Sequence, residues 1–343
     1  MPPSQATIQD ASPRLPKSLN LVIWILLAFM ALCIARAIVS QNMNYIDLKK
    51  YANMQEASPF QERILMAFVL RAADDSHAVL RVYDALFHKT VDTPEDFTVM
   101  VIDCICLLLM LPVTVALRRC FQPPPRTTWL APLMMLLVVA FTYVVHYEQR
   151  FTMPYDQLSL LLYSVGLLAI LRRNGWLLLL VLAVATPNRE TVVFLVPVWF
   201  WLEWREGRRI SAVAFSAAGL AVWMAWRLEI THFLHFGHQH YDLPWRNNLV
   251  SIYVPVHWPQ VLDIFAFLAV PMWMLRHYVK DPRLKDLWLA TAPFIIAAFI
   301  VGVWRENRIF GELSAIIGLT FALQLEQVLS CKGAVESLRR TGS

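Results

Sequence analysis

The chain has 343 residues, of which 58% are hydrophobic and 16% are charged, and its formal net charge is +5. Its mean hydropathy is +0.50. Soluble domains average about 45–50% apolar and about 25% charged residues, so this balance excludes an ordinary soluble domain. The excess apolar residues lie in long runs, which are typical of a polytopic membrane protein. We therefore expect an all-α fold, a transmembrane helical bundle.

The predicted elements form one membrane domain over 19–330, between a disordered cytoplasmic tail over 1–18 and a cytoplasmic tail over 331–343. Apolar runs separated by polar turns predict about ten spans. These spans are expected at 19–40, 97–117, 128–146, 157–171, 175–187, 190–204, 210–228, 259–275, 287–303 and 310–330.

Lysine and arginine favour one side of this arrangement. The short loops on the side of the N-terminus carry most of them, for example at 118–126, 172–173 and 205–209. Basic loops mark the cytoplasmic side of a membrane protein, so both termini are expected in the cytoplasm. Because the basic residues set topology in this way, we do not expect a nucleic-acid partner.

The first outer loop, over 41–96, is too long for a simple connector. Within it, SPFQERILMAFVLRAA (58–73) and HAVLRVYDALF (77–87) have apolar residues at roughly helical spacing. This spacing predicts two amphipathic helices lying along the membrane surface. A separate small domain is the alternative.

The stretch ATPNRETVVF (185–194) places charges between two apolar runs with almost no loop between them. Both runs are short, about 20 Å of helix against a hydrocarbon core of about 30 Å, so the turn should lie below the outer surface. Asn188 is placed to cap the second helix, and Arg189 offers a fork of donors suited to phosphate. Together with Glu190 they predict an anion site in an outer cavity. The alternative is that Arg189 and Glu190 pair with other loops and only hold the bundle together.

A second charged turn on the same face contains Arg305, Glu306 and Arg308. Two arginine-bearing turns on one face suit a phosphate or pyrophosphate headgroup. Interfacial anchoring is the alternative interpretation.

Two acidic residues are further candidates. Asp47 follows the first span closely, although a single aspartate in a loop is often only solvated. Asp156 immediately precedes the span at 157–171, where it is either a helix cap or a site residue.

The loop over 229–258 contains His232, His235, His238 and His240, near Asp242. These side chains could hold a divalent metal, but their spacing matches no established pattern, and an interfacial or substrate-covering role is favoured. The chain also has no glycine-rich phosphate loop. We therefore expect no cofactor to be required.

Several of these stretches occur together in a familiar order. The first span is followed by an outer loop with YIDLKKYA (45–52) and PFQERIL (59–65), and later come MPYDQ (153–157), ATPNRETVVF and WRENRIFGEL (304–313). Over about 19–325 this pattern resembles the GT-C superfamily of membrane glycosyltransferases, which use polyprenol-phosphate-linked sugars.

The resemblance implies a function and a set of roles. A lipid-linked sugar would bind on the extracytoplasmic face and pass to a saccharide acceptor. Asp47 would be the catalytic base, as the acidic residue of the first outer loop. Arg189, Arg305 or Arg308 would neutralise the leaving phosphate. A transporter, flippase or polymerase of lipid-linked saccharides, or a non-catalytic scaffold, are the alternatives.

Overall fold

The computed structural model describes residues 16–57, 60–121, 127–145, 151–234, 244–279, 281–302 and 307–341. These residues are almost entirely helical, as predicted. The exception is a two-residue parallel pairing of β1 (Met43–Asn44) with β2 (Phe151–Thr152). This pairing fastens the chain after the first long helix to the segment that precedes Asp156.

Five helical segments are long and apolar enough to cross a membrane: α1 (Lys17–Gln41), α5 (Pro94–Arg119), α10 (Arg209–Phe233), α14 (Pro282–Val301) and the segment Arg308–Ser330. The last of these combines η6 (Asn307–Leu313) with the start of α15 (Ser314–Thr341). Shorter apolar helices are α6 (Leu130–Ala140), which continues into η3 (Phe141–Val145), α7 (Asp156–Leu171) and α8 (Gly175–Ala185). These helices support a membrane protein built as a helical bundle, but they do not confirm the predicted count of about ten spans.

Two predicted spans differ from single helices. The span expected at 190–204 begins with a 3₁₀ segment, η4 (Glu190–Phe194), before α9 (Leu195–Arg205). The single helix expected at 259–275 is wrong, because it is divided into α12 (Trp258–Asp263) and α13 (Ala269–Met274). Between them Ala266 and Phe267 have φ of 50° and 58°, left-handed values that a right-handed helix cannot contain.

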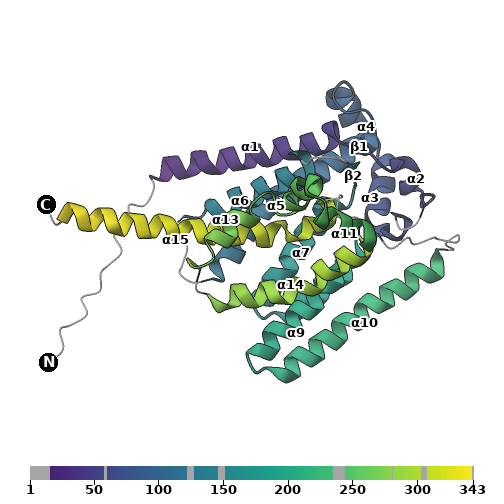
Figure 1. Ribbon diagram of the computed structural model, residues 1–343. Coiled ribbons are helices and arrows are strands. Elements are labelled where there is room, and N and C mark those ends of the chain that lie inside the picture. The colour runs from purple at the N-terminus through teal and green to yellow at the C-terminus, as the bar shows by residue number, and fades with distance from the viewer. Residues whose placement is uncertain are drawn as a thin grey trace.

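The two ends of the bundle differ in content (Figure 1). One end, here called the tail end, holds the first turn of α1 and the last turns of α15. The opposite end, here called the loop end, holds β1, β2 and the elements of the first loop. The elements of the first loop are α2 (Leu48–Ala52), η1 (Phe60–Glu62), α3 (Ile64–Asp74), α4 (His77–Val82) and η2 (Tyr83–Phe87). Two elements from much later in the chain, α11 (Trp245–Tyr253) and η5 (Pro255–His257), also lie at the loop end.

The two helices predicted within the first loop are formed, as α3 and as α4 continued by η2. The predictions for the two tails have different outcomes. Residues 1–15 lie outside the described residues, and α1 already begins at Lys17. The tail expected over 331–343 is helical through Thr341 as the continuation of α15.

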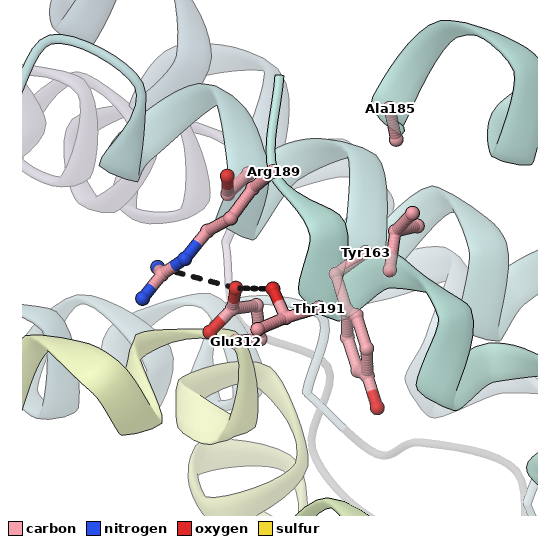
Figure 2. Close-up of a pocket in the computed structure, with 7 residues that line it drawn as sticks. Tyr163, Ala185, Arg189, Thr191 and Glu312 are labelled. Carbon is pink, nitrogen blue, oxygen red and sulfur yellow. Dashed lines mark hydrogen bonds and ion pairs between the residues drawn. The ribbon is translucent and has the colours of Figure 1, made fainter. Parts of the chain in front are cut away.

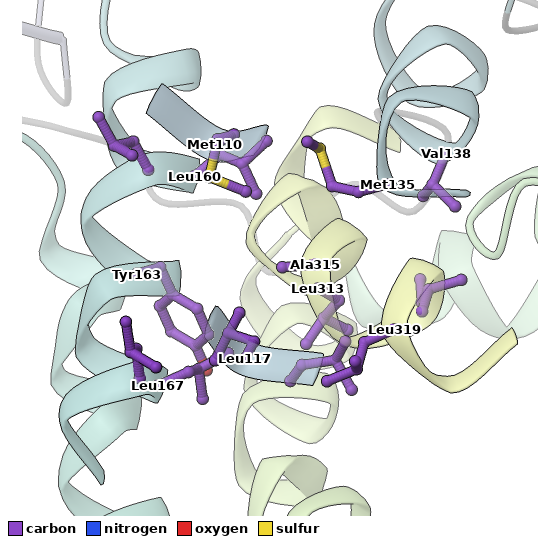
Figure 3. Close-up of a cluster of buried hydrophobic side chains, with 14 of the residues drawn as sticks. Met110, Leu117, Met135, Val138, Leu160, Tyr163, Leu167, Leu313, Ala315 and Leu319 are labelled. Carbon is purple, nitrogen blue, oxygen red and sulfur yellow. The ribbon is translucent and has the colours of Figure 1, made fainter. Parts of the chain in front are cut away.

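The core lies where α5, α6, α7 and α15 meet (Figure 3). In this layer α5 packs against α1 and α7, and α15 packs along α6. The last contact is close, because a Cβ at Gly318 would stand 2.7 Å from the backbone of Met135. Small residues allow such approaches between membrane helices. A second group is formed by α8, α9, α10 and α14, in which α10 and α14 each pack against α9.

Candidate functional site

The turn between α8 and α9 is buried inside the protein, while its predicted depth below the membrane surface stays a prediction. Asn188 is fully buried and Arg189 is 4% exposed. The first loop reaches this turn directly, because the backbone N–H of Leu65 donates to the carbonyl of Pro187 at 3.0 Å. Segments that lie more than a hundred residues apart in sequence therefore build one site at the loop end.

Arg189 joins three elements. Its Nη1 lies 3.3 Å from Oδ1 of Asp156, at the start of α7, and 3.2 Å from Oε1 of Glu312, in η6. Thr191 donates from Oγ1 to the same Glu312 oxygen at 2.6 Å. Figure 2 shows Arg189 and Thr191 converging on this carboxylate. Asp156 is thus a member of the site, and Arg308 approaches its other oxygen at 4.0 Å.

Asn188 does not cap the following helix. Its Nδ2 donates to the carbonyl of Tyr155 at 3.1 Å and to Oγ of Ser159 at 2.8 Å, which ties the turn to α7. The residue at the capping position is Arg189, and it makes no side-chain cap. The element that follows is a five-residue 3₁₀ segment and not the first turn of an α-helix, so the expected helix cap at Asn188 is wrong.

Two further ion pairs border the same site, and three of their four residues were not among the predicted candidates. Arg63 donates from Nη2 and Nε to the two oxygens of Glu190, at 3.0 and 3.3 Å. Arg227, near the end of α10, lies 2.5 Å from Glu62. The guanidinium of Arg63 also stacks over the ring of Tyr155, at 4.3 Å from its centroid. The sequence contained a signal for Arg227 alone. An arginine at the non-cytoplasmic end of a predicted span is unusual, because basic residues favour the cytoplasmic side.

A cavity of about 650 Å³ lies beside these pairs. Its polar part is lined by Glu62, Arg63, Arg189, Glu190, Arg227 and Arg308. Its apolar part is lined by Val193 and Phe194 of η4, Trp223 of α10, and Phe294, Ala297, Ala298 and Val301 of α14. We call it the arginine cavity. Guanidinium groups at one end and apolar helix faces at the other suit an amphiphilic anion.

Asp47 lies in a different place. It caps α2, accepting from the backbone N–H groups of Lys49 and Lys50 at 3.0 and 3.1 Å, and its side chain is 49% exposed. It lines a second cavity, of about 670 Å³, here called the acidic cavity. The acidic side chains lining this cavity are Asp47, Asp74, Asp92 and Glu95.

The two cavities flank one short segment of chain. Tyr45 lines the arginine cavity, whereas Asp47, two residues later, lines the acidic cavity. The structure therefore brings together Asn188, Arg189, Glu190, Asp156 and Arg308, but it does not bring Asp47 into their cavity.

The remaining predicted residues fall mostly outside the described parts of the chain. Arg305 and Glu306 lie there, as do residues 235–243 of the histidine-rich loop. Within the described residues, no three histidine, cysteine, aspartate or glutamate side chains are grouped so that they could hold a metal ion.

Comparison with known proteins adds no relative to these observations. No family model matches the chain, and neither the curated proteins nor the solved structures contain a match.

Proposed function

We propose that this chain is an integral membrane glycosyltransferase whose arginine cavity holds the phosphate of a polyprenyl-phosphate-linked sugar donor. The observation that carries the proposal is the arginine cavity itself, in which buried arginines meet an apolar wall within about 650 Å³. Intramembrane arginines are energetically expensive and are a mark of function. Arginine is also the side chain best suited to a phosphate, because its planar fork can donate two hydrogen bonds at once.

The apolar wall supports a long hydrocarbon chain as the other half of the ligand. Its residues on α14 are Phe294, Ala297, Ala298 and Val301, which follow the i, i+3, i+4, i+7 spacing of a single helix face. A polyprenyl chain lying along this face would keep its carbon atoms out of water while its phosphate meets the guanidinium groups.

In the proposed reaction, a hydroxyl oxygen of a saccharide acceptor attacks the anomeric carbon of the donor. The bond from this carbon to the phosphate oxygen breaks, and the lipid phosphate leaves with the electron pair. The guanidinium groups that line the arginine cavity stabilise the negative charge that develops on it; they belong to Arg63, Arg189, Arg227 and Arg308. The acceptor proton passes to a carboxylate base, for which Asp47 is the candidate, and the anomeric configuration inverts.

With Asp47 as base, the acceptor occupies the acidic cavity, where carboxylates can accept hydrogen bonds from sugar hydroxyls. The donor sugar would then extend from the arginine cavity past residues 45–47 to reach the acceptor hydroxyl. The substitution Asp47→Asn tests this assignment well, because asparagine caps a helix about as well as aspartate. We expect the rate of sugar transfer to fall by about 100-fold or more while the thermal unfolding temperature is unchanged. Full activity in a folded Asp47→Asn variant would remove Asp47 from the reaction.

Lipid binding is the first test. The full chain would be placed in nanodiscs, and binding of undecaprenyl phosphate would be followed by native mass spectrometry. Arg227→Gln is a better probe than a change at Arg189, because the Arg227 side chain is 27% exposed and pairs with Glu62, whereas Arg189 bridges two buried carboxylates. We expect roughly tenfold weaker binding, the value of one charge-assisted hydrogen bond.

The matched control is Arg205→Gln, at the tail end, where an arginine with a 58% exposed side chain pairs with Asp286. It should bind the lipid like the unmodified chain. Undecaprenol, which has the same chain without phosphate, separates the contribution of the tail from that of the headgroup. Equal binding of undecaprenol and undecaprenyl phosphate, or no loss in Arg227→Gln, would contradict the proposal.

Transport of a lipid-linked saccharide is the second candidate. The division of the region 258–274 into α12 and α13 favours it, since transporters build their sites around broken helices. Both candidates predict lipid binding. Transfer of a radiolabelled sugar to a soluble acceptor identifies the transferase, whereas appearance of intact labelled lipid in the opposite leaflet identifies the transporter.

A further inference from the structure

The charges around the arginine cavity are balanced, and this constrains how an anion can bind there. In the described part of the chain, the ion-paired cluster contains four guanidinium groups and four carboxylates: Arg63, Arg189, Arg227 and Arg308 with Glu62, Asp156, Glu190 and Glu312. Among these described residues the guanidinium groups and carboxylates are equal in number, so a phosphate entering the cluster adds negative charge to a balanced set. Burying an uncompensated charge is strongly unfavourable, so one carboxylate has to give up its arginine.

The exposure of the four carboxylates indicates which one can move. The side chains of Glu62, Asp156 and Glu312 are 6%, 3% and 1% exposed. That of Glu190 is 33% exposed and lines the arginine cavity. Its backbone is held separately, because Nε1 of Trp223 donates to the Glu190 carbonyl at 3.1 Å. The carboxylate can therefore swing away while the turn stays in place.

The arginine that Glu190 would release is held in position independently. Arg63 has a side chain only 10% exposed and stacks on Tyr155, which fixes the plane of its guanidinium. Nε and Nη2 of Arg63 now donate to the two oxygens of Glu190. Two phosphate oxygens can take the same two positions, because a phosphate accepts from the arginine fork in the same bidentate manner.

We propose that the Glu190 carboxylate is an internal competitor of the lipid phosphate, which binds by displacing it from Arg63. This inference rests on the proposed lipid-phosphate function. Glu190 is thus a positioning residue. When no ligand is bound, its carboxylate neutralises the buried Arg63 within the bilayer. It also makes the cavity selective, because a neutral lipid cannot replace the carboxylate on the guanidinium.

The test compares Glu190→Gln and Arg63→Gln with the unmodified chain, using undecaprenyl phosphate in phosphatidylcholine nanodiscs. Glu190→Gln removes the competing charge, so we expect about tenfold tighter binding, equivalent to about 1.4 kcal/mol. Arg63→Gln removes the shared partner and should weaken binding by a similar factor. Loss of binding is the usual result of damage to a site, so a gain in Glu190→Gln cannot come from misfolding.

Glu206→Gln is the matched control, because the Glu206 side chain is also 33% exposed and is paired with an arginine, Arg173, in the turn between α9 and α10. It should leave binding unchanged. A second readout is the rise in unfolding temperature caused by the lipid, which should be larger in Glu190→Gln than in the unmodified chain.

The outcomes separate this inference from the proposed function. If the unmodified chain binds the lipid and Glu190→Gln binds it equally or more weakly, the competition is refuted and the lipid site stands. Binding that appears only in Glu190→Gln would support the competition. Absence of binding in all variants would refute both.

Discussion

The two cavities at the loop end have similar volumes, about 650 and 670 Å³, but opposite arrangements of charge. In the arginine cavity, both lining carboxylates, Glu62 and Glu190, are in contact with guanidinium groups. In the acidic cavity, four carboxylates share one lining cation, Lys49. Four guanidinium groups and two carboxylates line the arginine cavity, and Asp156 and Glu312, which contact Arg189 behind the lining, complete the balance. The lining of the acidic cavity, by contrast, carries an excess of negative charge.

This difference indicates how each cavity can exist and what it can bind. Balanced ion pairs can be enclosed beside apolar helices, because each charge has a partner in place of water. Excess carboxylates need water or a ligand that donates hydrogen bonds. Consistent with this, Asp47 has a side chain 49% exposed, whereas Arg189 has one only 5% exposed. The arginine cavity suits a membrane-embedded anion and the acidic cavity suits a hydroxylated or cationic ligand.

The largest expected effect is on stability, in the arginine cavity. Arg189→Gln leaves Asp156 and Glu312 facing each other without the guanidinium that now lies 3.3 and 3.2 Å from them. Breaking a buried ion pair from one side costs about 3–5 kcal/mol, so we expect a marked loss in the free energy of unfolding. Reversible unfolding in detergent, followed by circular dichroism, measures it.

The same measurement has an internal check. Adding Glu312→Gln to Arg189→Gln removes one of the stranded carboxylates, so the double variant should recover part of the lost stability. Arg205→Gln, at an exposed pair, should change stability by less than about 1 kcal/mol. If Arg189→Gln were as mild as Arg205→Gln, the enclosed and balanced character of the arginine cavity would be wrong.

The next effect concerns the apolar half of the arginine cavity, where α14 supplies one continuous face. Ala297→Phe places a ring on the cavity-lining face of α14. We expect binding of undecaprenyl phosphate to weaken by about tenfold, since the ring takes up space that the chain would fill. Titration of the lipid into nanodiscs, with native mass spectrometry as the readout, measures this loss.

Chain length provides the control for Ala297→Phe. A short-chain analogue with the same phosphate should lose less affinity, because less of it reaches the blocked region. An equal loss for long and short chains would mean that the substitution disturbs the guanidinium groups instead. In that case, the apolar wall would not be the seat of the lipid chain.

The sequence predicted the buried turn because its cause is local. Two short apolar runs with almost no loop between them place Arg189 and Glu190 at a tight turn between helices, and the depth of that turn in a membrane stays a prediction. Asp156 could be placed at the start of an apolar run, but from the sequence it was either a helix cap or a site residue. These predictions needed only element length and position.

The rest depended on tertiary contacts that leave little mark in the sequence. Arg63 pairs with Glu190 across 127 positions, and in its own segment it looks like any charge on an amphipathic helix. Asn188 has the residue type of a helix cap, but its amide is used by α7 instead. The break at Ala266 and Phe267 was equally hidden, since neither residue type favours left-handed backbone.

The smallest expected effect is a pH-dependent change in stability, and it concerns Asp74 of the acidic cavity. Burial, aided by the neighbouring Glu95, raises the pKa of Asp74 above its ordinary value of 3.8, despite the opposing effect of Lys49. A folded-state pKa above the unfolded value means that the folded protein binds the Asp74 proton more tightly than the unfolded chain does. Proton binding therefore stabilises the fold at low pH, and this stabilisation is lost as the pH rises through the folded pKa. Asp74→Asn should therefore stabilise the chain at pH 7, by less than about 1 kcal/mol, and the gain should shrink as the pH falls toward 4. Unfolding of both proteins across this range measures the difference.

Two outcomes would contradict this prediction. A gain in stability that does not depend on pH would come from something other than the Asp74 carboxylate charge. A loss of stability at pH 7 would mean that a cation compensates the excess negative charge of the acidic cavity.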